Sequence, residues 1–425
     1  MTLGSRGDVQ PFVNLGRGLR AAGYRVRLVT GRGFGDMAAT AGLDYAPIDL
    51  DFAALIKDPQ VTASLRSPMG LLRFWRQAGE LVRHSLDASV EAAAGVDAIV
   101  HHPKMIAAPH LAERFGLPLV AATLQPILSP TADFPSPLLP VRQLGRWGNQ
   151  LSHCLVLRLM ATGGYPRVLS AWRAERLHLP PKSRLPTNAT MVAGRAVPVL
   201  YGYSPALVPR SMDWSDLAHV TGAWFGPVET SWQPPAPLAR FLAEGPRPVY
   251  VGFGSMVTGD AAEKGRMVVA ALAKAGLRGI VASGWGGLAS EAAPHVYALD
   301  EAPHAWLFPR CATVVHHGGA GTTHEGLRWG RPTLACPVFG DQPWWGRRIA
   351  DLGVGPAPVP PRRLSIDRLA ASLVDLVSIR AYADKAGVLG ALLRAEDGVG
   401  TAVSQIRHIL DLPQSRHCIR GDAVS

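Results

Sequence analysis

Short apolar runs alternate along the chain with segments whose apolar residues recur at helical spacing. In the first half this pattern predicts strands at 24–30, 98–101 and 118–123, and helices at 15–22, 67–94 and 110–115. Strands that alternate with helices are typical of a parallel sheet with helices on its faces. The pattern therefore predicts an α/β fold.

The pattern stops at 225–237, where prolines cluster, and then restarts. Beyond this break it predicts strands at 248–255, 278–283, 312–315 and 332–336, and helices at 267–275, 322–328 and 344–352. We expect two Rossmann-like domains at 1–225 and 241–412, a linker at 226–240 and a polar, disordered tail at 413–425. Ligands of such sheets bind at the carboxyl ends of the strands.

The first strand is the irregular element, because only Met1, Thr2 and Leu3 precede the turn that runs from Gly4 to Asp8. It is expected to be a stub, unless translation begins upstream. The size of the chain, 425 residues of which 48% are hydrophobic, is sufficient for two cores. The start of the chain lacks a signal-peptide pattern, and no apolar run reaches the length of a membrane helix.

Four scattered cysteines without CxxC spacing favour neither a disulfide framework nor a zinc site, and they fit the reducing cytoplasm. The net charge is +11 and rests mainly on arginine. This charge indicates either a solvated surface or attraction to anionic substrates and membranes, with peripheral membrane contact as one outcome. Nucleic acid is not an expected partner, since no dense basic run or nucleic-acid-binding signature accompanies the charge.

A glycine-rich turn, 316–323, follows the strand at 312–315 and opens the next helix. Glycines let the backbone approach an anion, and the free N–H groups of a helix start attract negative charge. His317, Thr322 and Thr323 add side-chain donors. The turn therefore predicts a diphosphate cradle. Downstream, Asp341 and Gln342 offer a carboxylate and an amide suited to sugar hydroxyls.

Four segments, 4–11, 251–256, 302–306 and 316–342, resemble in this order the sterol and antibiotic glucosyltransferase branch of the UDP-dependent glycosyltransferases. The resemblance implies the GT-B fold, in which two Rossmann-like domains face each other across a cleft. It further implies that the first domain binds the acceptor and the second a nucleotide sugar.

The resemblance implies roles for the turn after the stub strand. Asp8 occupies the position of the family's general base, which is Asp in bacterial members and His in plant and animal ones. The alternative is that Asp8 caps the following helix. Ser5 and Arg6 share the turn and either contact the donor or are solvated. Ser255 ends a strand of the second half, either within reach of the diphosphate or ribose or in a plain turn.

The other implied contacts lie in the second half. His317, Gly319, Gly321, Thr322 and Thr323 would hold the diphosphate, although both threonines could instead cap the helix. Asp341 and Gln342 match the sugar-binding pair, with helix capping as the alternative.

Two positions bear on the nucleoside. Glu325 matches a ribose-binding glutamate of plant relatives that the microbial sterol branch usually lacks. Plant enzymes stack a tryptophan on uracil where this chain has Glu301, so recognition would fall to the backbone around Ala302. Both UDP and dTDP therefore stay open as the nucleotide of the donor.

The function expected from the resemblance is inverting transfer of a sugar, glucose from UDP-glucose, to a hydroxyl of a sterol, polyketide or lipid. Residues 124–139 and 74–86 would line the acceptor pocket. No cofactor is expected beyond the UDP-sugar co-substrate, and no metal, because the cradle lacks a DxD carboxylate pair. Alternatives are a natural-product glycosyltransferase that uses a dTDP-deoxysugar, and a non-catalytic nucleotide-sugar binder.

Overall fold

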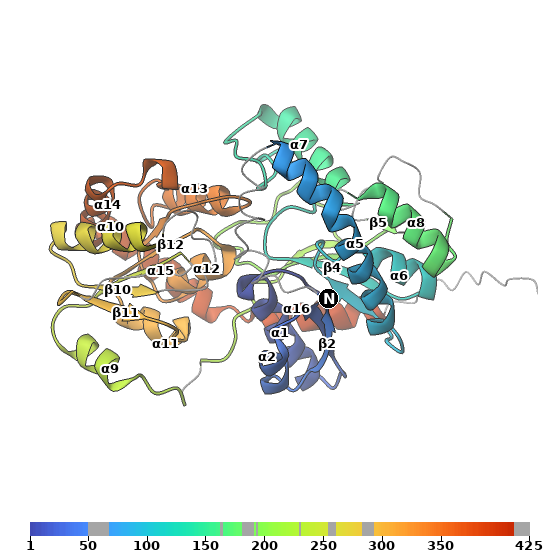
Figure 1. The fold of residues 1–425 in the computed structure, drawn as a ribbon, viewed down its shortest axis with the longest axis horizontal. Helices are drawn as coiled ribbons and strands as arrows, with labels where there is room; N and C mark the ends of the chain where they lie inside the picture. The colour runs from blue at the N-terminus through green and yellow to red at the C-terminus, as the bar shows by residue number, and fades with distance from the viewer. Residues whose placement is uncertain are drawn as a thin grey trace, which may run out of the picture.

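Two parallel β-sheets, each flanked by helices, form the centres of two domains that lie side by side in the computed structural model (Figure 1). The structure describes residues 1–49, 68–161, 165–180, 191–192, 194–228, 231–253, 261–282 and 293–411. The expectations for Ser255 and for the tail 413–425 lie outside the described residues.

The sheet of the first domain consists of two groups of parallel strands joined by residues 1–3. One group is β1 (Arg27–Gly31) and β2 (Asp44–Ile48); the other, in spatial order, is β3 (Ile99–His101), β4 (Leu119–Thr123), β7 (Val199–Tyr201) and β8 (Ala218–Val220). The Thr2 N–H donates to the Val29 carbonyl at 3.0 Å, and the His102 N–H donates to the Met1 carbonyl at 2.9 Å. The expected stub therefore lies between β1 and β3, in the middle of the sheet.

Helices cover both faces of this sheet, and the pattern predicted half of them. They are α1 (Arg6–Ala21), α2 (Gly35–Thr40), α5 (Pro68–Ala92), α6 (Ala108–Phe115), α7 (Gly145–Met160) and α8 (Pro166–Leu177). A short antiparallel pair, β5 (Met191–Val192) and β6 (Arg195–Ala196), lies outside the main sheet. Helices α2, α7 and α8 and strands β2, β7 and β8 were not anticipated, because their apolar runs are short or are interrupted by arginines and polar residues.

The sheet of the second domain has the strand order β11-β10-β9-β12-β13, and all neighbouring strands are parallel. The strands are β9 (Val249–Gly252), β10 (Gly279–Ala282), β11 (Val296–Leu299), β12 (Thr313–His316) and β13 (Thr333–Ala335). The chain reverses direction across the sheet between β9 and β12, which is the topological switch point where ligands of such sheets bind. The predicted strands are confirmed here, and β11 is an addition.

The helices of the second half are α9 (Ala236–Ala243), α10 (Ala261–Lys274), α11 (His304–Leu307), α12 (Ala320–Arg328), α13 (Gln342–Leu352), α14 (Ile366–Ser378), α15 (Arg380–Ala395) and α16 (Gly398–Asp411). Two short 3₁₀ turns, Phe308–Arg310 and Pro361–Arg363, complete it. The two-domain α/β architecture agrees with the prediction.

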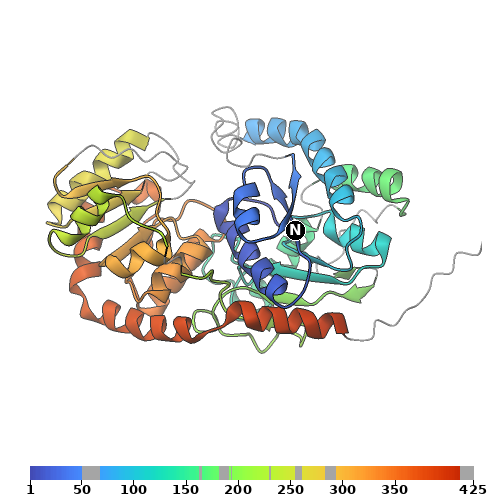
Figure 2. The same ribbon diagram turned by 90° about the horizontal axis from the view of Figure 1, so that it is seen from below.

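The domain boundaries need two corrections. Helix α9 begins at Ala236, inside the stretch predicted as linker, because the prolines of that stretch lie at the helix start where proline is tolerated. Helix α16 leaves the second domain and packs on α1 of the first (Figure 2). Its buried Ala402 and Ile406 belong to an apolar cluster that extends from the first domain into the second, so the second domain does not simply run to residue 412.

Candidate active site at the domain junction

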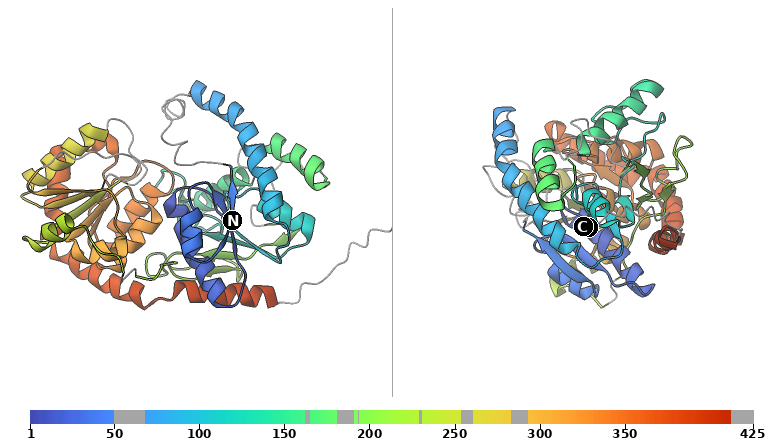
Figure 3. Two further views of the ribbon diagram at one scale, coloured as in Figure 1. Left: turned by 60° about the horizontal axis from the view of Figure 1, so that its bottom comes forward. Right: turned by 90° about the vertical axis from the view of Figure 1, so that its right-hand side faces the viewer.

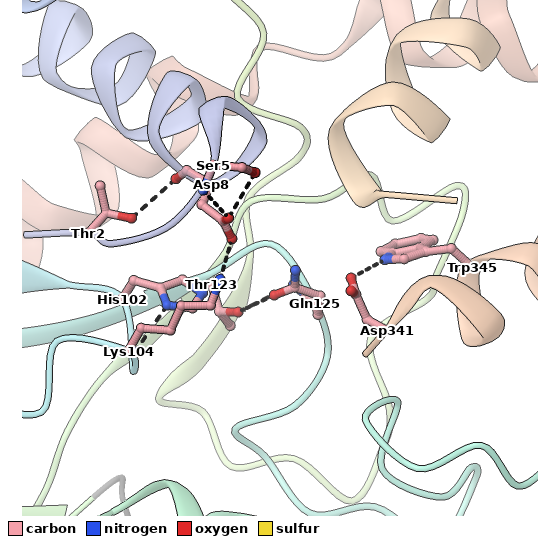
Figure 4. Close-up of polar contacts among 9 residues, drawn as sticks. All are labelled: Thr2, Ser5, Asp8, His102, Lys104, Thr123, Gln125, Asp341 and Trp345. Atoms are coloured by element: carbon pink, nitrogen blue, oxygen red, sulfur yellow. Dashed lines mark hydrogen bonds and ion pairs between the residues drawn. The ribbon is translucent and has the colours of Figure 1, made fainter. Parts of the chain in front are cut away.

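Polar side chains from both domains meet where their strands end. Asp8 follows the stub strand, Lys104 follows β3 and Gln125 follows β4, whereas His317 follows β12 and Asp341 follows β13. Figure 4 shows Gln125 between Lys104 with Asp8 on one side and Asp341 on the other. These are carboxyl ends of parallel strands, as expected for a ligand site in this architecture.

Asp8 is the third residue of α1 and forms a capping box with Ser5. The Ser5 backbone N–H donates to Asp8 Oδ2 at 2.9 Å, and the Ser5 hydroxyl donates to the same oxygen at 3.1 Å. Gly4 has a φ of +142°, and a side chain there would overlap the Asp8 carboxylate. The helix therefore begins at Arg6 with Ser5 as its N-cap, and the alternative in which Asp8 itself is the N-cap is wrong.

The second oxygen of Asp8 faces a cation. Lys104 Nζ donates to Asp8 Oδ1 at 2.7 Å, and the Asp8 side chain is only 18% exposed. Burial by itself would raise the pKa of Asp8, but the Lys104 ammonium and the Ser5 N–H outweigh it and hold that pKa below its ordinary value. Asp8 is therefore an anion throughout the neutral range.

Lys104 and Gln125 were not among the predicted site residues. Gln125 accepts a hydrogen bond from the Thr123 hydroxyl at 2.9 Å, and its side chain acts to lower the pKa of Asp341. Both residues lie shortly after predicted strands, and this position was the signal in the sequence that could have identified them. Residues just past the carboxyl end of a parallel strand lie at the same edge as the nucleotide turn.

The glycine-rich turn holds two histidines in different ways. His316 is fully buried, and its Nδ1 accepts a hydrogen bond from the Gly318 N–H at 2.9 Å. This bond to the buried His316 ring holds the backbone of the glycine-rich turn. His317 reaches the junction, where its Nδ1 is buried without a partner among the described residues. Burial lowers the pKa of His317 to about 4, against the opposing effect of Asp8, so its imidazole is neutral at pH 7.

Two glycines of the turn are required by close approach. A Cβ on Gly319 would lie 2.5 Å from His317 Nε2, and a Cβ on Gly318, where φ is +89°, would lie 2.9 Å from the Gln342 carbonyl oxygen. A Cβ on Gly321, by contrast, would meet nothing within 4 Å. Glycine thus lets the His317 ring lie against the backbone at the start of α12.

The start of α12 presents backbone donors. Gly319 is the N-cap and supplies no side chain, so no side-chain group caps the first N–H groups of the helix. The Thr323 hydroxyl donates to the Gly319 carbonyl at 2.9 Å, a bond within the helix that caps none of its N–H groups, so the capping alternative does not hold for Thr323. Thr322 lies one residue earlier and is partly exposed. The arrangement can bind an anion through main-chain N–H groups.

Asp341 and Gln342 begin α13. Asp341 Oδ2 accepts a hydrogen bond from Trp345 Nε1 at 3.0 Å, and burial, together with the nearby Asp8 charge, raises the pKa of Asp341 against the opposing effect of Gln125. Gln342 is buried, and its Oε1 accepts the N–H groups of Val338 at 2.8 Å and Phe339 at 3.3 Å. Gln342 therefore holds the loop that carries Asp341.

Arg6 and the loop before α11 meet across the junction. Arg6 forms an ion pair with Glu301, which occupies the position where plant enzymes stack a tryptophan on uracil. Ala302 follows it and is partly buried. The Arg6 guanidinium, predicted to contact the donor, thus binds the second domain directly. This exposed ion pair connects the two domains at one side of the junction.

Glu325 lies one turn further along α12 than the cradle. Its carboxylate accepts a hydrogen bond from Trp329 Nε1 at 2.7 Å and lies 3.6 Å from Arg328, and burial raises its pKa.

Among the described residues there is no cluster of three or more His, Cys, Asp or Glu side chains that would suit a metal ion. Nor does the described part of the chain contain a helix long and apolar enough to cross a membrane.

Two family models match the chain in the order of its domains. The glycosyltransferase family 28 N-terminal domain matches residues 1–131, and the erythromycin biosynthesis protein CIII-like C-terminal domain matches residues 281–397.

Crystal structures of other proteins share the fold of this chain. The glycotransferase of kitacinnamycin has a TM-score of 0.68 at 20% identity, covering 96% of this chain and 97% of its own. The glycosyltransferase VinC in complex with DTDP has a TM-score of 0.62 at 20% identity, covering 96% and 98%. Both support the GT-B fold.

Similar sequences come from plants and fungi. Two sterol 3-beta-glucosyltransferases of Arabidopsis thaliana are 36% and 34% identical, covering 95% and 98% of this chain and 64% and 69% of their own lengths. That of Candida albicans is 34% identical over 99% of this chain but only 28% of its own length. The chain thus spans under two thirds of the first plant relative and a smaller part of the fungal one. The shared fold, the two matched domains and these identities show that the chain belongs to the glycosyltransferase family that includes the sterol 3-beta-glucosyltransferases.

Proposed function

We propose that this protein transfers glucose from UDP-glucose to a hydroxyl group of a lipophilic acceptor, with a sterol as the first candidate. The proposal is supported by the plant and fungal relatives, which are named sterol 3-beta-glucosyltransferases. The observation that carries it is the meeting of an ionised Asp8 with the donor-rich start of α12 at one domain junction. A proton acceptor and an anion site on opposite sides are the two elements that a transfer by direct displacement needs.

In the proposed reaction Asp8 acts as the general base. The acceptor hydroxyl displaces Lys104 from one carboxylate oxygen and passes its proton to Asp8 while its oxygen bonds to the anomeric carbon. The bond from that carbon to the diphosphate breaks at the same time, and UDP leaves with the electron pair. A carboxylate of low pKa is a weak base, so proton transfer is expected to accompany bond formation rather than precede it. One displacement inverts the anomeric configuration.

The leaving diphosphate is assigned to the start of α12. The backbone N–H groups there, Thr322 and the imidazole of His317 would take up the charge that develops on UDP. Because His317 is neutral in the protein without ligand, the arriving diphosphate would raise the pKa of His317 and strengthen its hydrogen bond. The backbone around Ala302 would bind the base, and Ser255 and Glu325 stay expected contacts of the diphosphate and ribose.

Asp341 would bind the sugar hydroxyls, and Gln342 would hold the loop that positions it. A buried hydrogen bond to a sugar hydroxyl selects between epimers, since a polar group left unpaired costs free energy. The proposal includes no metal, as the α12 start and His317 supply the stabilising potential. We expect EDTA to leave the rate unchanged, and loss of activity that Mg²⁺ or Mn²⁺ restores would contradict this.

We propose that the reaction takes place in the cytoplasm. The described cysteines, Cys154, Cys311 and Cys336, are all free thiols, which fits a reducing compartment.

A donor and acceptor screen tests the function. The protein is incubated with UDP-glucose, UDP-galactose or dTDP-glucose and with a sterol, a polyketide or a long-chain alcohol, and products are identified by mass spectrometry. We expect a sterol glucoside from UDP-glucose with the β configuration, read from the anomeric proton coupling. Transfer from dTDP-glucose alone would favour the natural-product alternative. UDP binding without transfer from any donor would indicate a binding protein.

A further inference from the structure

Helix α7 carries a row of apolar side chains that points away from the protein. Trp147, Leu151, Leu155 and Leu159 are 88%, 69%, 64% and 66% exposed. Their spacing of four residues places them on one face of the helix. Large apolar side chains that line up on the surface, instead of being scattered singly, mark an interaction surface.

The opposite face of α7 is fixed to the first domain by polar contacts. Asn149 Nδ2 donates to the Ala132 carbonyl at 2.8 Å, Ser152 Oγ accepts the Ser136 N–H at 2.8 Å, and His153 Nε2 lies 3.1 Å from the Phe134 carbonyl. All three bonds hold the segment that follows β4. The helix therefore cannot rotate to bury its apolar row, and that row has no cover among the residues that the structure describes.

The charge beside the row has one sign. Arg146 and Arg158 are exposed on α7, and the helix contains no aspartate or glutamate. Carboxylates near α7 belong to other elements and already have partners: Asp351 lies 3.8 Å from Arg142, Asp213, which Arg146 influences, is bound by the Ala132 N–H, and Asp133 accepts the Ser211 hydroxyl. Arg158 shares the face of the row, and Arg146 lies in the first turn of the helix, so the exposed surface of α7 combines a tryptophan and leucines with arginines. This is the pattern of a helix that lies in a membrane surface.

We propose that the row Trp147, Leu151, Leu155 and Leu159 docks this protein on the surface of an anionic phospholipid bilayer. The leucines enter the boundary between head groups and acyl chains, Trp147 lies at the head-group level, and Arg146 and Arg158 bind lipid phosphates. A second copy of the chain fits less well. Two such helices packed antiparallel about a two-fold axis would bring arginines together with no carboxylate between them.

The docked helix would also place the bilayer beside the acceptor region. The segment that α7 holds, 131–136, lies within the stretch expected to line the acceptor pocket, and its Phe134 ring lies 5.6 Å from the Trp344 ring of α13 in the second domain. A lipophilic acceptor could pass from the bilayer to the junction without crossing water. This second part rests on the proposed function, whereas membrane docking does not.

Co-sedimentation with vesicles tests the docking. The vesicles contain phosphatidylcholine and phosphatidylglycerol in equal amounts, or phosphatidylcholine alone. We expect binding to the anionic vesicles, weakened about tenfold or more by the double substitution Leu151→Gln/Leu155→Gln. Arg146→Gln/Arg158→Gln should weaken it about tenfold and reduce its salt dependence. The matched control is Val388→Gln/Leu392→Gln, an exposed apolar pair at the same spacing on α15, which should change nothing.

Thermal melting shows that each variant is folded. The proposal is overturned if the wild-type protein ignores anionic vesicles, or if Leu151→Gln/Leu155→Gln binds them as tightly as the wild type. A change in molecular mass from dimer to monomer in that variant, without vesicle binding by the wild type, would assign the face to a second copy.

Acceptor delivery is tested separately with one sterol, supplied either in anionic vesicles or in detergent micelles. We expect Leu151→Gln/Leu155→Gln to lose about tenfold in rate with vesicles and nothing with micelles, in line with its weaker vesicle binding. Equal loss in both would reject delivery from the bilayer. If no acceptor is glucosylated in either form, the proposed function fails, and the vesicle-binding result still decides the docking proposal.

Discussion

A single carboxylate, Asp8, combines a structural task with a proposed chemical one. Its Oδ2 completes the capping box of α1, whereas its Oδ1 faces the junction and binds Lys104. The cap fixes the position of the side chain to within one rotamer, because both the Ser5 N–H and hydroxyl bind the same oxygen. Positioning of this kind is what a general base requires.

The substitution Asp8→Asn tests this base. The amide oxygen can still accept the Ser5 N–H, so the fold and UDP binding should persist, but the side chain can no longer take up a proton. We expect the transfer rate to fall by about 10²–10⁴-fold, the usual contribution of a general base. Steady-state kinetics and calorimetry with UDP provide the measurements. A variant that keeps more than about a tenth of the wild-type rate would exclude Asp8 from this role.

Lys104 is expected to set the pH range in which Asp8 works. The ammonium lowers the pKa of Asp8, so the carboxylate stays ionised to lower pH than a solvated aspartate would. Lys104→Gln removes this effect, the pKa of Asp8 rises, and the acidic limb of kcat/KM should move to higher pH. The control is Lys274→Gln, which breaks a surface pair with Asp367 of the same 2.7 Å length and should leave the profile in place. An unmoved acidic limb in Lys104→Gln would mean that another group controls it.

At the scale of elements, the strand–turn–helix unit β12–α12 forms the proposed anion site. The strand ends in the buried His316, the turn follows with Gly318 and Gly319, and the helix begins with uncapped N–H groups. The absence of a side chain at Gly319 leaves the place that the His317 ring occupies. The same unit lies against the Gln342 carbonyl at the start of α13, so the proposed diphosphate and sugar contacts are neighbours.

We predict that Gly319→Ala weakens UDP binding by about tenfold or more, because the added methyl group displaces the His317 ring and with it one hydrogen bond to the diphosphate. Gly387→Ala on α15 serves as control, since a Cβ there meets nothing within 4 Å. Calorimetric titration with UDP measures both variants. Wild-type affinity in Gly319→Ala would show that His317 does not contribute to binding.

At the scale of the whole molecule, the two domains share an interface with both apolar and polar contacts. Tyr203 of the first domain packs on Trp345 of the second at 6.3 Å between ring centres, and the Ser204 N–H donates to His324 Nε2 at 3.2 Å. Helix α16 adds a second connection because it passes from the second domain to the first (Figure 3). The ion pair between Arg6 and Glu301 is exposed, so it contributes orientation rather than stability.

The docking of α16 has a measurable consequence. Ile406 is 2% exposed in the core of the first domain, and Ile406→Ala should lower the free energy of unfolding by about 2–5 kcal/mol. Val377→Ala, at a half-exposed position of α14, should change it by less than about 0.5 kcal/mol. Denaturant unfolding followed by tryptophan fluorescence gives both values. If Ile406→Ala behaves like the control, α16 does not pack on α1 in solution.

Local signals in the sequence were sufficient for much of the fold and part of the site. The apolar runs at 118–123 and 312–315 predicted β4 and β12 to within one or two residues, because a strand buried on both faces must be continuously apolar. The glycine-rich turn was predicted to open a helix, and it does. Asp8 and His317 were named from their motifs, and the structure brings them to the same junction.

Other features depend on contacts between residues distant in sequence. The three residues before Gly4 are too few to predict a strand, yet hydrogen bonds to β1 and β3 place them at the centre of the sheet. Lys104 carries no motif, and only the meeting of β3 with the start of α1 brings its ammonium to Asp8, 96 residues away.

By itself, then, the sequence determined the α/β class, the division into two halves and the glycine-rich turn that opens a helix, because hydrophobic periodicity and glycine geometry act over a few neighbouring residues. Only the tertiary structure decided that α16 packs on the first domain, that Arg6 binds Glu301, and that the apolar row of α7 faces outward. An amphipathic helix has the same sequence pattern whichever surface its apolar face meets. The direction of that face is set by polar contacts, such as those of Asn149 and Ser152, that form only when distant segments come together.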